Sequence, residues 1–225
     1  KFIGFMDADD EVTEEYSDII NILKNVNSDF YVFEHYTLSN EKLRRSTRVL
    51  MEQGKNEKRI LYNNFLTGSS CSVWNNVYRT EIIRKYNICF PCEMSMGEDC
   101  VFNARYIRHC ENVYYIPKVG YKYYEDNGGS ASNSVKISYL KDFVIIYENY
   151  IQIYNSYDNL EFSFYSGYYI DKVYLILKNS RTKMSKEERR AFKETDFYHE
   201  IMNHRYKYWA REIRKWLIKW YLCVG

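Results

Sequence analysis

The chain has 225 residues and a net charge of +2; 46% of its residues are hydrophobic, 28% charged and 18% aromatic. No apolar run approaches the roughly 18 residues that a membrane-spanning helix needs, which excludes an integral helical membrane protein. This content of charged and aromatic residues also excludes a disordered chain. With 25 Tyr against 9 Gly and 2 Pro, the composition favours long helices and a few strands over a β-sandwich rich in tight turns.

The start of the chain is unusual for a domain. The first residue is Lys1 rather than Met, and a strand expected at residues 2–6 is hydrophobic on both faces. That pattern is typical of a central strand with a neighbour on each side. At roughly 150 residues per domain, the length corresponds to one domain or one and a half. We therefore expect the sequence to be a fragment of a longer protein.

Strands and short helices alternate in the front part of the sequence. After the strand at 2–6, the patterns predict a helix at 13–25 and an aromatic, β-branched strand at 29–37. Residues 38–58 are polar and charged, which predicts a solvated excursion. The remaining elements expected here are helices at 58–66, 80–85 and 98–109 and short strands at 112–117 and 119–124.

The character of the sequence changes near residue 134. Four segments with helical periodicity follow, at 137–154, 161–178, 185–197 and 200–221. Ser185 and Glu188 form the pattern of a capping box at the start of the third. We therefore divide the chain into a strand-containing part, 1–134, and a helical extension, 135–225.

Charge and cysteine usage indicate the surroundings of the protein. Residues 1–130 hold 16 Lys and Arg against 19 Asp and Glu, whereas residues 131–225 hold 16 against 11. The acidic N-terminal part suggests a site lined by carboxylates, and the basic C-terminal part suggests a segment that binds a negatively charged surface. The six Cys lack framework spacing and no Asn-x-Ser/Thr sequon is present, which favours a reducing cytosol. Cys89 and Cys92 are interpreted as reduced thiols rather than zinc ligands, because no second pair has matching spacing.

The first group of candidate site residues is Asp7, Asp9 and Asp10, at the end of the first strand. The carboxyl ends of strands face the ligand crevice in open α/β sheets. In an extended chain Asp7 and Asp9 point to the same side, about 6.5 Å apart, and two such carboxylates repel unless a cation lies beside them. Mg²⁺ or Mn²⁺ would suit these oxygen ligands. The alternative is an acidic loop that only caps the following helix.

The second group is Glu98 and Asp99, which follow Gly97 and open a predicted helix. Carboxylates in a first helical turn can simply interact with the helix dipole. If both groups line one crevice, however, a metal site faces a free carboxylate that can act as a base.

These groups belong to a series of motifs that resembles a family 2 glycosyltransferase, similar to bacterial capsule and cell-wall members. The resemblance covers roughly residues 1–134. The motifs that carry it are, in chain order, Ile3-Gly4-Phe5-Met6-Asp7-Ala8-Asp9-Asp10, Ser72-Val73-Trp74-Asn75-Asn76-Val77-Tyr78-Arg79, Phe90, Gly97-Glu98-Asp99, Tyr123-Tyr124 and Ser130-Ala131-Ser132.

The resemblance implies an α/β fold, namely a partial GT-A (nucleotide-diphospho-sugar transferase) fold followed by the α-helical extension. Asp7 and Asp10 would then belong to the donor site, with Asp7 near the ribose or the metal. Asp9 would ligate Mn²⁺ or Mg²⁺ on the diphosphate of a nucleotide sugar. Trp74 would flank the sugar pocket, although a core Trp is an equally good interpretation.

The same resemblance implies that Asp99, with Glu98 beside it, is the base that deprotonates the acceptor hydroxyl in an inverting displacement. The donor would be a nucleotide sugar, most simply a UDP-sugar, and the acceptor a glycan or a lipid-linked hydroxyl in bacterial cell-envelope polysaccharide biosynthesis. The piece alone is expected to be inactive. Two alternatives stay open: a metal-dependent phosphotransferase or nuclease using the same carboxylates, and a non-enzymatic module that binds membrane surfaces.

The sequence departs from the family pattern in two places. The family usually places Arg or His after the Tyr pair, but this chain has Glu125, Asp126 and Asn127. Stabilisation of the leaving group is therefore expected to be weaker or to come from elsewhere, such as Lys122. No Gln-x-x-Arg-Trp motif follows, which argues against a processive synthase.

The C-terminal segment 200–225 combines aromatic and basic residues. Trp209, Ile213, Trp216, Leu217 and Trp220 fall on one helical face, and six Lys and Arg lie between residues 205 and 219. Tryptophan opposite Lys and Arg is typical of a helix at the surface of an anionic membrane. The alternative is a helix packed on the rest of the extension. Nucleic acid is disfavoured as a partner because the N-terminal part is acidic. From the cysteine usage and this C-terminal segment we expect a cytoplasmic protein with peripheral contact to the inner face of the membrane.

Overall fold

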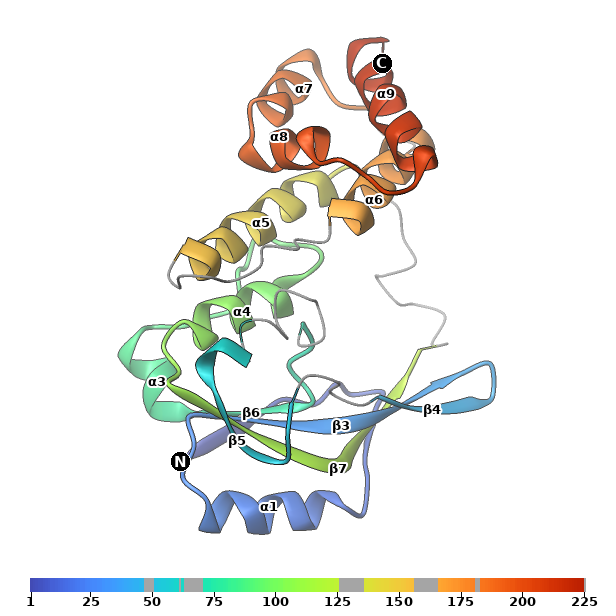
Figure 1. The fold of residues 1–225 in the computed structure, drawn as a ribbon. Helices are drawn as coiled ribbons and strands as arrows, with labels where there is room; N and C mark the ends of the chain where they lie inside the picture. The colour runs from blue at the N-terminus through green and yellow to red at the C-terminus, as the bar shows by residue number, and fades with distance from the viewer. Residues whose placement is uncertain are drawn as a thin grey trace.

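The computed structural model describes residues 1–46, 51–60, 62, 71–125, 136–155, 166–180 and 183–224. The described chain has a curled sheet covered on one face by α1 (Tyr16–Asn25) and on the other by α4 (Glu98–Ile107). A stack of further helices lies beyond α4, so the molecule is elongated from the sheet towards the C-terminus (Figure 1).

The sheet is mixed. Its strand order is β1 (Phe2–Gly4), β6 (Asn76–Arg79), β3 (Phe30–Ser39), β7 (Asn112–Tyr124) and β2 (Glu11–Val12), while β4 (Lys42–Ser46) pairs with β3 and β5 (Gly54–Glu57) with β7. Only β3 and β7 run parallel among these pairs. The side chains of Phe30, Tyr31, Val32 and Phe33 are all buried, as expected of a central strand covered on both faces.

Among the described residues β1 pairs with β6 alone and ends the strand order, so the second neighbour expected from the sequence stays a prediction. The apolar side chains at this edge meet aromatic rings of β3 and β6. Phe2 meets the ring of Tyr31 edge-on at 5.3 Å, and Phe5 meets Tyr78 at 5.5 Å.

The described part of the solvated excursion expected at 38–58 contains regular structure: β4 is exposed to solvent, and both β4 and β5 are strands. Asn40 and Glu41 have φ values of 49° and 62°, and they join β3 to β4 in a two-residue hairpin. β5 then pairs with residues 112–115 of β7. Residues 58–60 are helical, and most of the rest of the helix predicted for 58–66 lies outside the described residues.

The two short strands predicted at 112–117 and 119–124 form one strand, β7, with an irregularity between them. Phe33 of β3 pairs with Ile116 and Glu34 pairs with Val119, so Pro117 and the residue after it have no partner in the β3 ladder. Proline has no N–H to donate to a ladder, which explains the position of the bulge. The Pro117 carbonyl accepts a hydrogen bond from Arg45 Nη2 at 3.0 Å.

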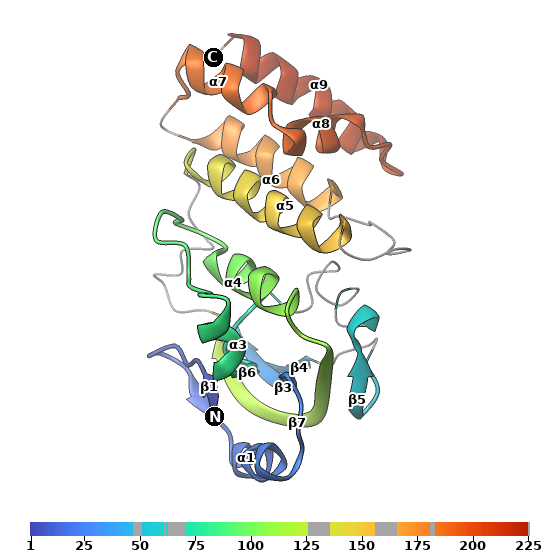
Figure 2. The same cartoon turned by 90° about the vertical axis from the view of Figure 1, so that its left-hand side faces the viewer.

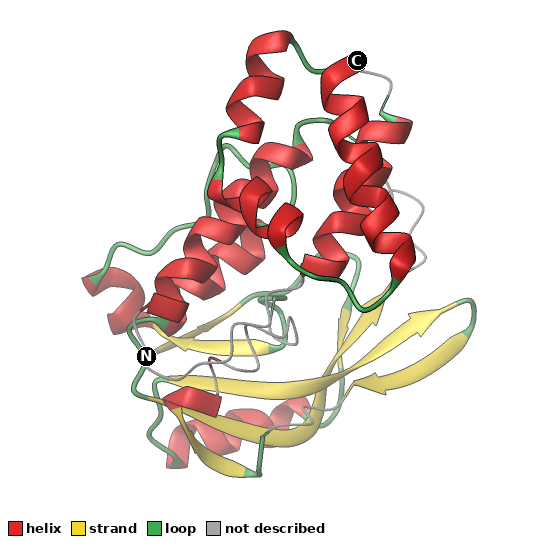
Figure 3. Ribbon diagram, turned by 45° about the horizontal axis from the view of Figure 1, so that its top comes forward, coloured by secondary structure: helices red, strands yellow, loops and turns green. Residues whose placement is uncertain are grey.

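The helices predicted at 80–85 and 98–109 correspond to α3 (Thr80–Lys85) and α4. The extension contains α5 (Tyr139–Asn155), α6 (Ser166–Asn179), α7 (Lys186–Lys193), α8 (Asp196–Asn203) and α9 (Trp209–Val224) (Figures 2 and 3). The capping box of Ser185 and Glu188 is confirmed, with bonds of 3.1 and 2.8 Å. The last two predicted helices are divided differently, because Thr195 caps a new helix, α8.

One buried cluster runs from the sheet through α4 into the extension. It includes Phe30, Tyr78, Phe102, Phe143 and Phe197. A second, smaller cluster lies between the sheet and α1. The extension therefore packs on α4 through a continuous core, and the boundary placed near residue 134 falls outside the described residues and stays a prediction.

Within the described ranges, none of the helices has the length and apolarity needed to cross a membrane.

Candidate functional site

The acidic loop after β1 is held in place by β7. The strand ends at Gly4, and Ala8 and Asp9 form a turn in which Asp10 N donates to Asp7 O at 3.3 Å. Asp7 and Asp9 are therefore not neighbours on one side of an extended strand, as the sequence suggested. Both are exposed, so their carboxylates are accessible to a ligand.

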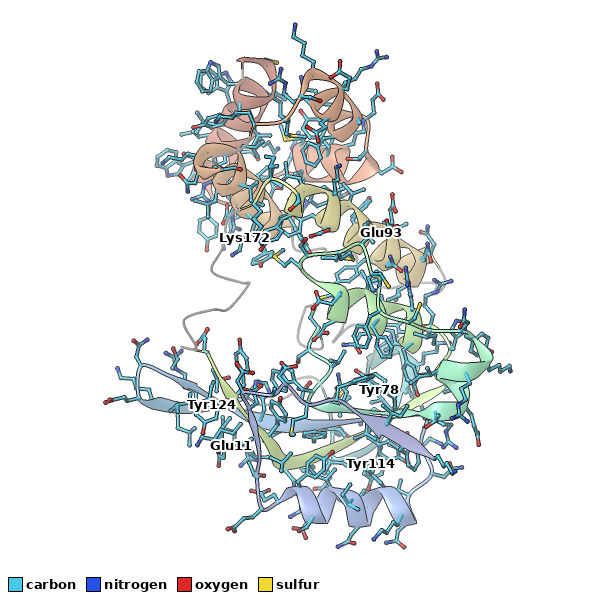
Figure 4. The ribbon with its side chains drawn as sticks, turned by 180° about the vertical axis from the view of Figure 1, so that it is seen from behind. Glu11, Tyr78, Glu93, Tyr114, Tyr124 and Lys172 are labelled. Atoms are coloured by element: carbon cyan, nitrogen blue, oxygen red, sulfur yellow. The ribbon has the colours of Figure 1, made fainter. Side chains whose placement is uncertain are left out.

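Asp10 has a visible structural role in this loop. Its Oδ2 accepts a hydrogen bond from Tyr121 Oη at 2.8 Å, and its Oδ1 accepts one from Tyr124 N at 2.9 Å. The Tyr121 hydroxyl in turn accepts a bond from Asp7 N at 3.0 Å. Both oxygens of Asp10 thus fasten the loop to β7; Figure 4 labels the following residue, Glu11, and Tyr124 of β7. The exposed carboxylates of the loop are those of Asp7 and Asp9.

The second acidic group lies at the start of α4. Gly97 precedes the helix with a φ of 78°, a conformation that glycine adopts without strain. Glu98 is exposed, whereas Asp99 is more buried and accepts a hydrogen bond at Oδ2 from Val73 N at 3.3 Å. This bond connects Asp99 to the segment that carries Trp74.

The structure brings the two acidic groups together. Burial raises the pKa of Asp99 to about 7, with repulsion from Glu98 and Asp7 adding to the shift and the Val73 N–H opposing it. Burial also raises the pKa of Asp7, together with repulsion from Asp10, Asp9 and Glu98. Residues more than 90 positions apart thus share one field of negative charge, in which a carboxylate favours its protonated form.

The donor atoms at this place suit a hard cation. Exposed carboxylate oxygens are the ligands that Mg²⁺ and Mn²⁺ prefer, and a cation would relieve the repulsion around Asp7. Among the described residues, no group of three or more His, Cys, Asp and Glu side chains is arranged to hold a metal by itself. Two protein carboxylates with oxygens from a substrate and from water would be the fitting set. Cys89 and Cys92 are exposed and unpaired.

Trp74 is a packed residue. Its side chain is buried, with its indole nearly parallel to the rings of Tyr121 at 4.6 Å and Tyr123 at 5.4 Å. His35 meets it edge-on at 4.6 Å. Tyr121 also holds the acidic loop through its bonds to Asp7 and Asp10, so Trp74 supports the loop indirectly by packing on the Tyr121 ring. The core interpretation of Trp74 describes these contacts, and its part in a sugar pocket stays a prediction.

Two polar residues that hold segments around the site, Asn103 and Asp142, were not singled out from the sequence. The buried side chain of Asn103 donates to the carbonyls of Cys71 and Ser72 at 3.0 and 3.1 Å and accepts at 2.6 Å from the hydroxyl of Tyr78, which Figure 4 labels. Asp142 on α5 accepts a bond from Ser95 N at 3.2 Å, so the extension holds the loop before Gly97. An isolated polar residue within an apolar helical pattern is the signal that could have indicated both.

No protein-family model matches the chain, and no curated protein matches it. Solved structures of S. aureus TarS do resemble it. TarS 1–349 in complex with UDP-GlcNAc superposes with a TM-score of 0.57 at 19% identity, covering 90% of this chain and 57% of that one. The same protein without that ligand gives 0.53 at 14% identity over 84% of this chain and 58% of that one. The complex with UDP gives 0.51 at 17% identity over 79% and 45%.

This chain therefore spans less than three fifths of the length of the TarS 1–349 structures that it resembles. The likeness confirms the fold class expected from the sequence: α/β, with a partial glycosyltransferase-like fold followed by an α-helical extension.

Proposed function

We propose that this chain carries the metal and acceptor part of a family 2 glycosyltransferase. The enzyme would transfer a sugar from a nucleotide-sugar donor to a hydroxyl of a glycan or lipid-linked acceptor, with inversion and without processivity. The observation that carries the proposal is the meeting of the Asp7–Asp10 loop and Asp99 at one place on a glycosyltransferase-like fold. The complexes of TarS with UDP-GlcNAc and UDP support a nucleotide sugar as the donor.

Asp99 is suited to the role of base. A carboxyl with a pKa of about 7 is ionised in half of the molecules near neutral pH and accepts a proton more readily than an ordinary aspartate. In the proposed step the acceptor oxygen forms a bond to the anomeric carbon and its proton passes to Asp99. The bond from that carbon to the phosphate oxygen breaks, and the nucleoside diphosphate leaves with the bonding pair.

Asp7 and Asp9 are suited to hold the cation. Both are exposed in a loop that Tyr121 fastens, so a ligand can approach their side chains while the loop backbone is held. A bound Mn²⁺ or Mg²⁺ would supply positive charge against the diphosphate as it becomes the leaving group. In this proposal the cation faces the donor diphosphate, and Asp99 faces the acceptor hydroxyl.

The test compares three single variants with the unchanged sequence, each in the full-length gene product, because the piece alone is expected to be inactive. Calorimetry measures Mn²⁺-dependent binding of UDP, and a coupled assay measures UDP release from UDP-GlcNAc with glucose or glycerol as acceptor. We expect Asp9→Asn to weaken UDP binding about tenfold or more, because a ligand carboxylate is lost. Asp99→Asn should leave UDP binding intact and lower UDP release by roughly 10²–10⁴-fold. Glu81→Gln, an exposed acid on α3, is the matched control and should behave as the unchanged chain.

Three results would overturn the proposal. UDP release at the normal rate by Asp99→Asn would remove its assigned role. Mg²⁺-dependent cleavage of bis(p-nitrophenyl) phosphate without UDP release would favour a phosphotransferase or nuclease. An unchanged full-length gene product that neither binds UDP nor releases it would contradict the proposal.

A further inference from the structure

The C-terminal helix α9 has two opposed faces, and only one of them packs on the protein. Ile218 and Leu222 are buried. On the same side, Arg211 Nη2 and Arg214 Nη1 both form ion pairs with Asp171 of α6, the first at 3.2 Å. The basic residues that the sequence placed opposite the tryptophans thus belong in part to the packing face.

The other face leaves large apolar side chains in solvent. Trp209, Ile213, Trp216 and Trp220 are 76, 46, 65 and 47% exposed. Their spacing of four, three and four residues aligns them along one side of the helix, which we call the tryptophan stripe. Ile218 lies two residues after Trp216, about 200° further round the helix, which is why the stripe points away from the core. The helix therefore packs on the extension and still presents its tryptophans.

Positive charge borders the stripe. Lys219 is exposed on α9 itself. Cys223 follows Trp216 by seven residues, which places it on nearly the same side of the helix, and Lys193 Nζ of α7 reaches its Sγ at 3.6 Å. A groove of about 520 Å³ opens here, between α7 and the end of α9, and its basic lining residues are Lys186, Arg189, Arg190 and Lys193.

The acidic residues next to this surface are paired. Glu212 on α9 forms an ion pair with Lys215 at 3.1 Å and accepts a hydrogen bond from Tyr206 N. Glu194 in the groove pairs with Arg190 at 3.0 Å. The stripe and its border therefore present apolar rings and net positive charge together.

We propose that the tryptophan stripe and the basic groove at its end form a docking surface for an anionic lipid bilayer. Tryptophan rings prefer the headgroup level of a bilayer, where the ring is dehydrated and its N–H stays hydrogen-bonded. Lys and Arg beside them are attracted to acidic headgroups. The stripe lies along one helix of 16 residues, about 24 Å long, which suits a flat surface. This inference is independent of the proposed function.

Vesicle co-sedimentation of the whole chain tests the proposal. The probes are vesicles of phosphatidylcholine alone and vesicles of phosphatidylcholine with phosphatidylglycerol in equal amounts. We expect binding to the anionic vesicles, with a blue shift of tryptophan fluorescence. Binding to the neutral vesicles should be weaker by about tenfold or more. The double change Trp216→Ser with Trp220→Ser should lower binding about tenfold or more while circular dichroism stays unchanged, because both side chains are exposed.

Two further variants separate the contributions. Lys193→Glu with Lys219→Glu should weaken binding to anionic vesicles and leave the small binding to neutral ones unchanged. Leu43→Ser removes a comparably exposed apolar side chain from β4 and should have no effect. The proposal is overturned if the tryptophan double variant binds as the unchanged chain does, or if the unchanged chain binds neither vesicle. Self-association that the double variant abolishes, without vesicle binding, would assign the stripe to a protein contact.

Discussion

Replacing Gly97 tests two features of the structure at once: the left-handed backbone before α4 and the packing of α5 against that position. It precedes Glu98 and Asp99 with a φ of 78°, and a Cβ placed on it would lie 2.5 Å from Ile146 Cδ1 of α5. We expect Gly97→Ala to cost roughly 1–2 kcal/mol for the left-handed backbone. The overlap with the buried Ile146 side chain should add roughly 1–3 kcal/mol.

The two contributions can be separated with a second change. Ile146→Val removes the Cδ1 atom, so the closest atom still present on that side chain is Cγ1, at 3.4 Å. By itself this change should cost about 0.5–1.5 kcal/mol. When Ile146→Val is already present, Gly97→Ala should lower the free energy of unfolding only by the roughly 1–2 kcal/mol of the left-handed backbone. Gly54→Ala is the control, because Gly54 has a φ of 102° with no atom within 4 Å of an added Cβ; only a backbone cost is expected there.

Urea unfolding of the four variants and the unchanged chain gives the free energies of unfolding, provided that the m-values agree. The steric part of the reasoning is refuted if Gly97→Ala costs the same with and without Ile146→Val. The backbone part is refuted if Gly97→Ala becomes free of cost once Ile146→Val is present.

Three further predictions concern other parts of the molecule. Between about pH 4 and pH 7 the free energy of unfolding of the metal-free chain should fall as pH rises, because unfolded Asp99 loses its proton near its ordinary pKa while the folded form keeps it to about 7. Asp99→Asn should flatten part of that slope in urea titrations, and an unchanged slope would contradict the burial of this carboxyl. Tyr121→Phe removes the hydroxyl that bonds to Asp7 and Asp10 and should cost roughly 1–3 kcal/mol, with faster amide exchange at Asp7; native protection there would argue against the anchor. Ser185→Ala should cost about 1 kcal/mol by loss of the capping box, measured as a lower urea midpoint.

Several features of the fold could be predicted because they are local. The helix at 80–85, the start of the helix at Glu98 and the capping box at Ser185 depend on residues within a few positions of one another. The hairpin at Asn40 was missed because its second strand, β4, is polar: β4 lies at the edge of the sheet, where exposed side chains carry no hydrophobic alternation.

The candidate site was predicted as two acidic groups, and their residue types followed from motifs that are contiguous in the chain. That Asp7 lies near Glu98 depends on the packing of α4 over the sheet, and the anchor of the acidic loop, Tyr121, is more than 110 positions away. The shifted pKa of Asp99 is likewise a property of burial, which no local pattern specifies.

The sequence by itself thus determined the chemistry that is available: the carboxylates, the tryptophans and their periodic spacing. The tertiary structure decided which of them share a place and which face of a helix is covered. On α9 the periodicity correctly aligned the tryptophans, but Asp171 of α6 pairs with Arg211 and Arg214 and turns the opposite side towards the core. The physical reason is that ion pairing and burial depend on partners brought close only by folding, whereas periodicity depends on the chain alone.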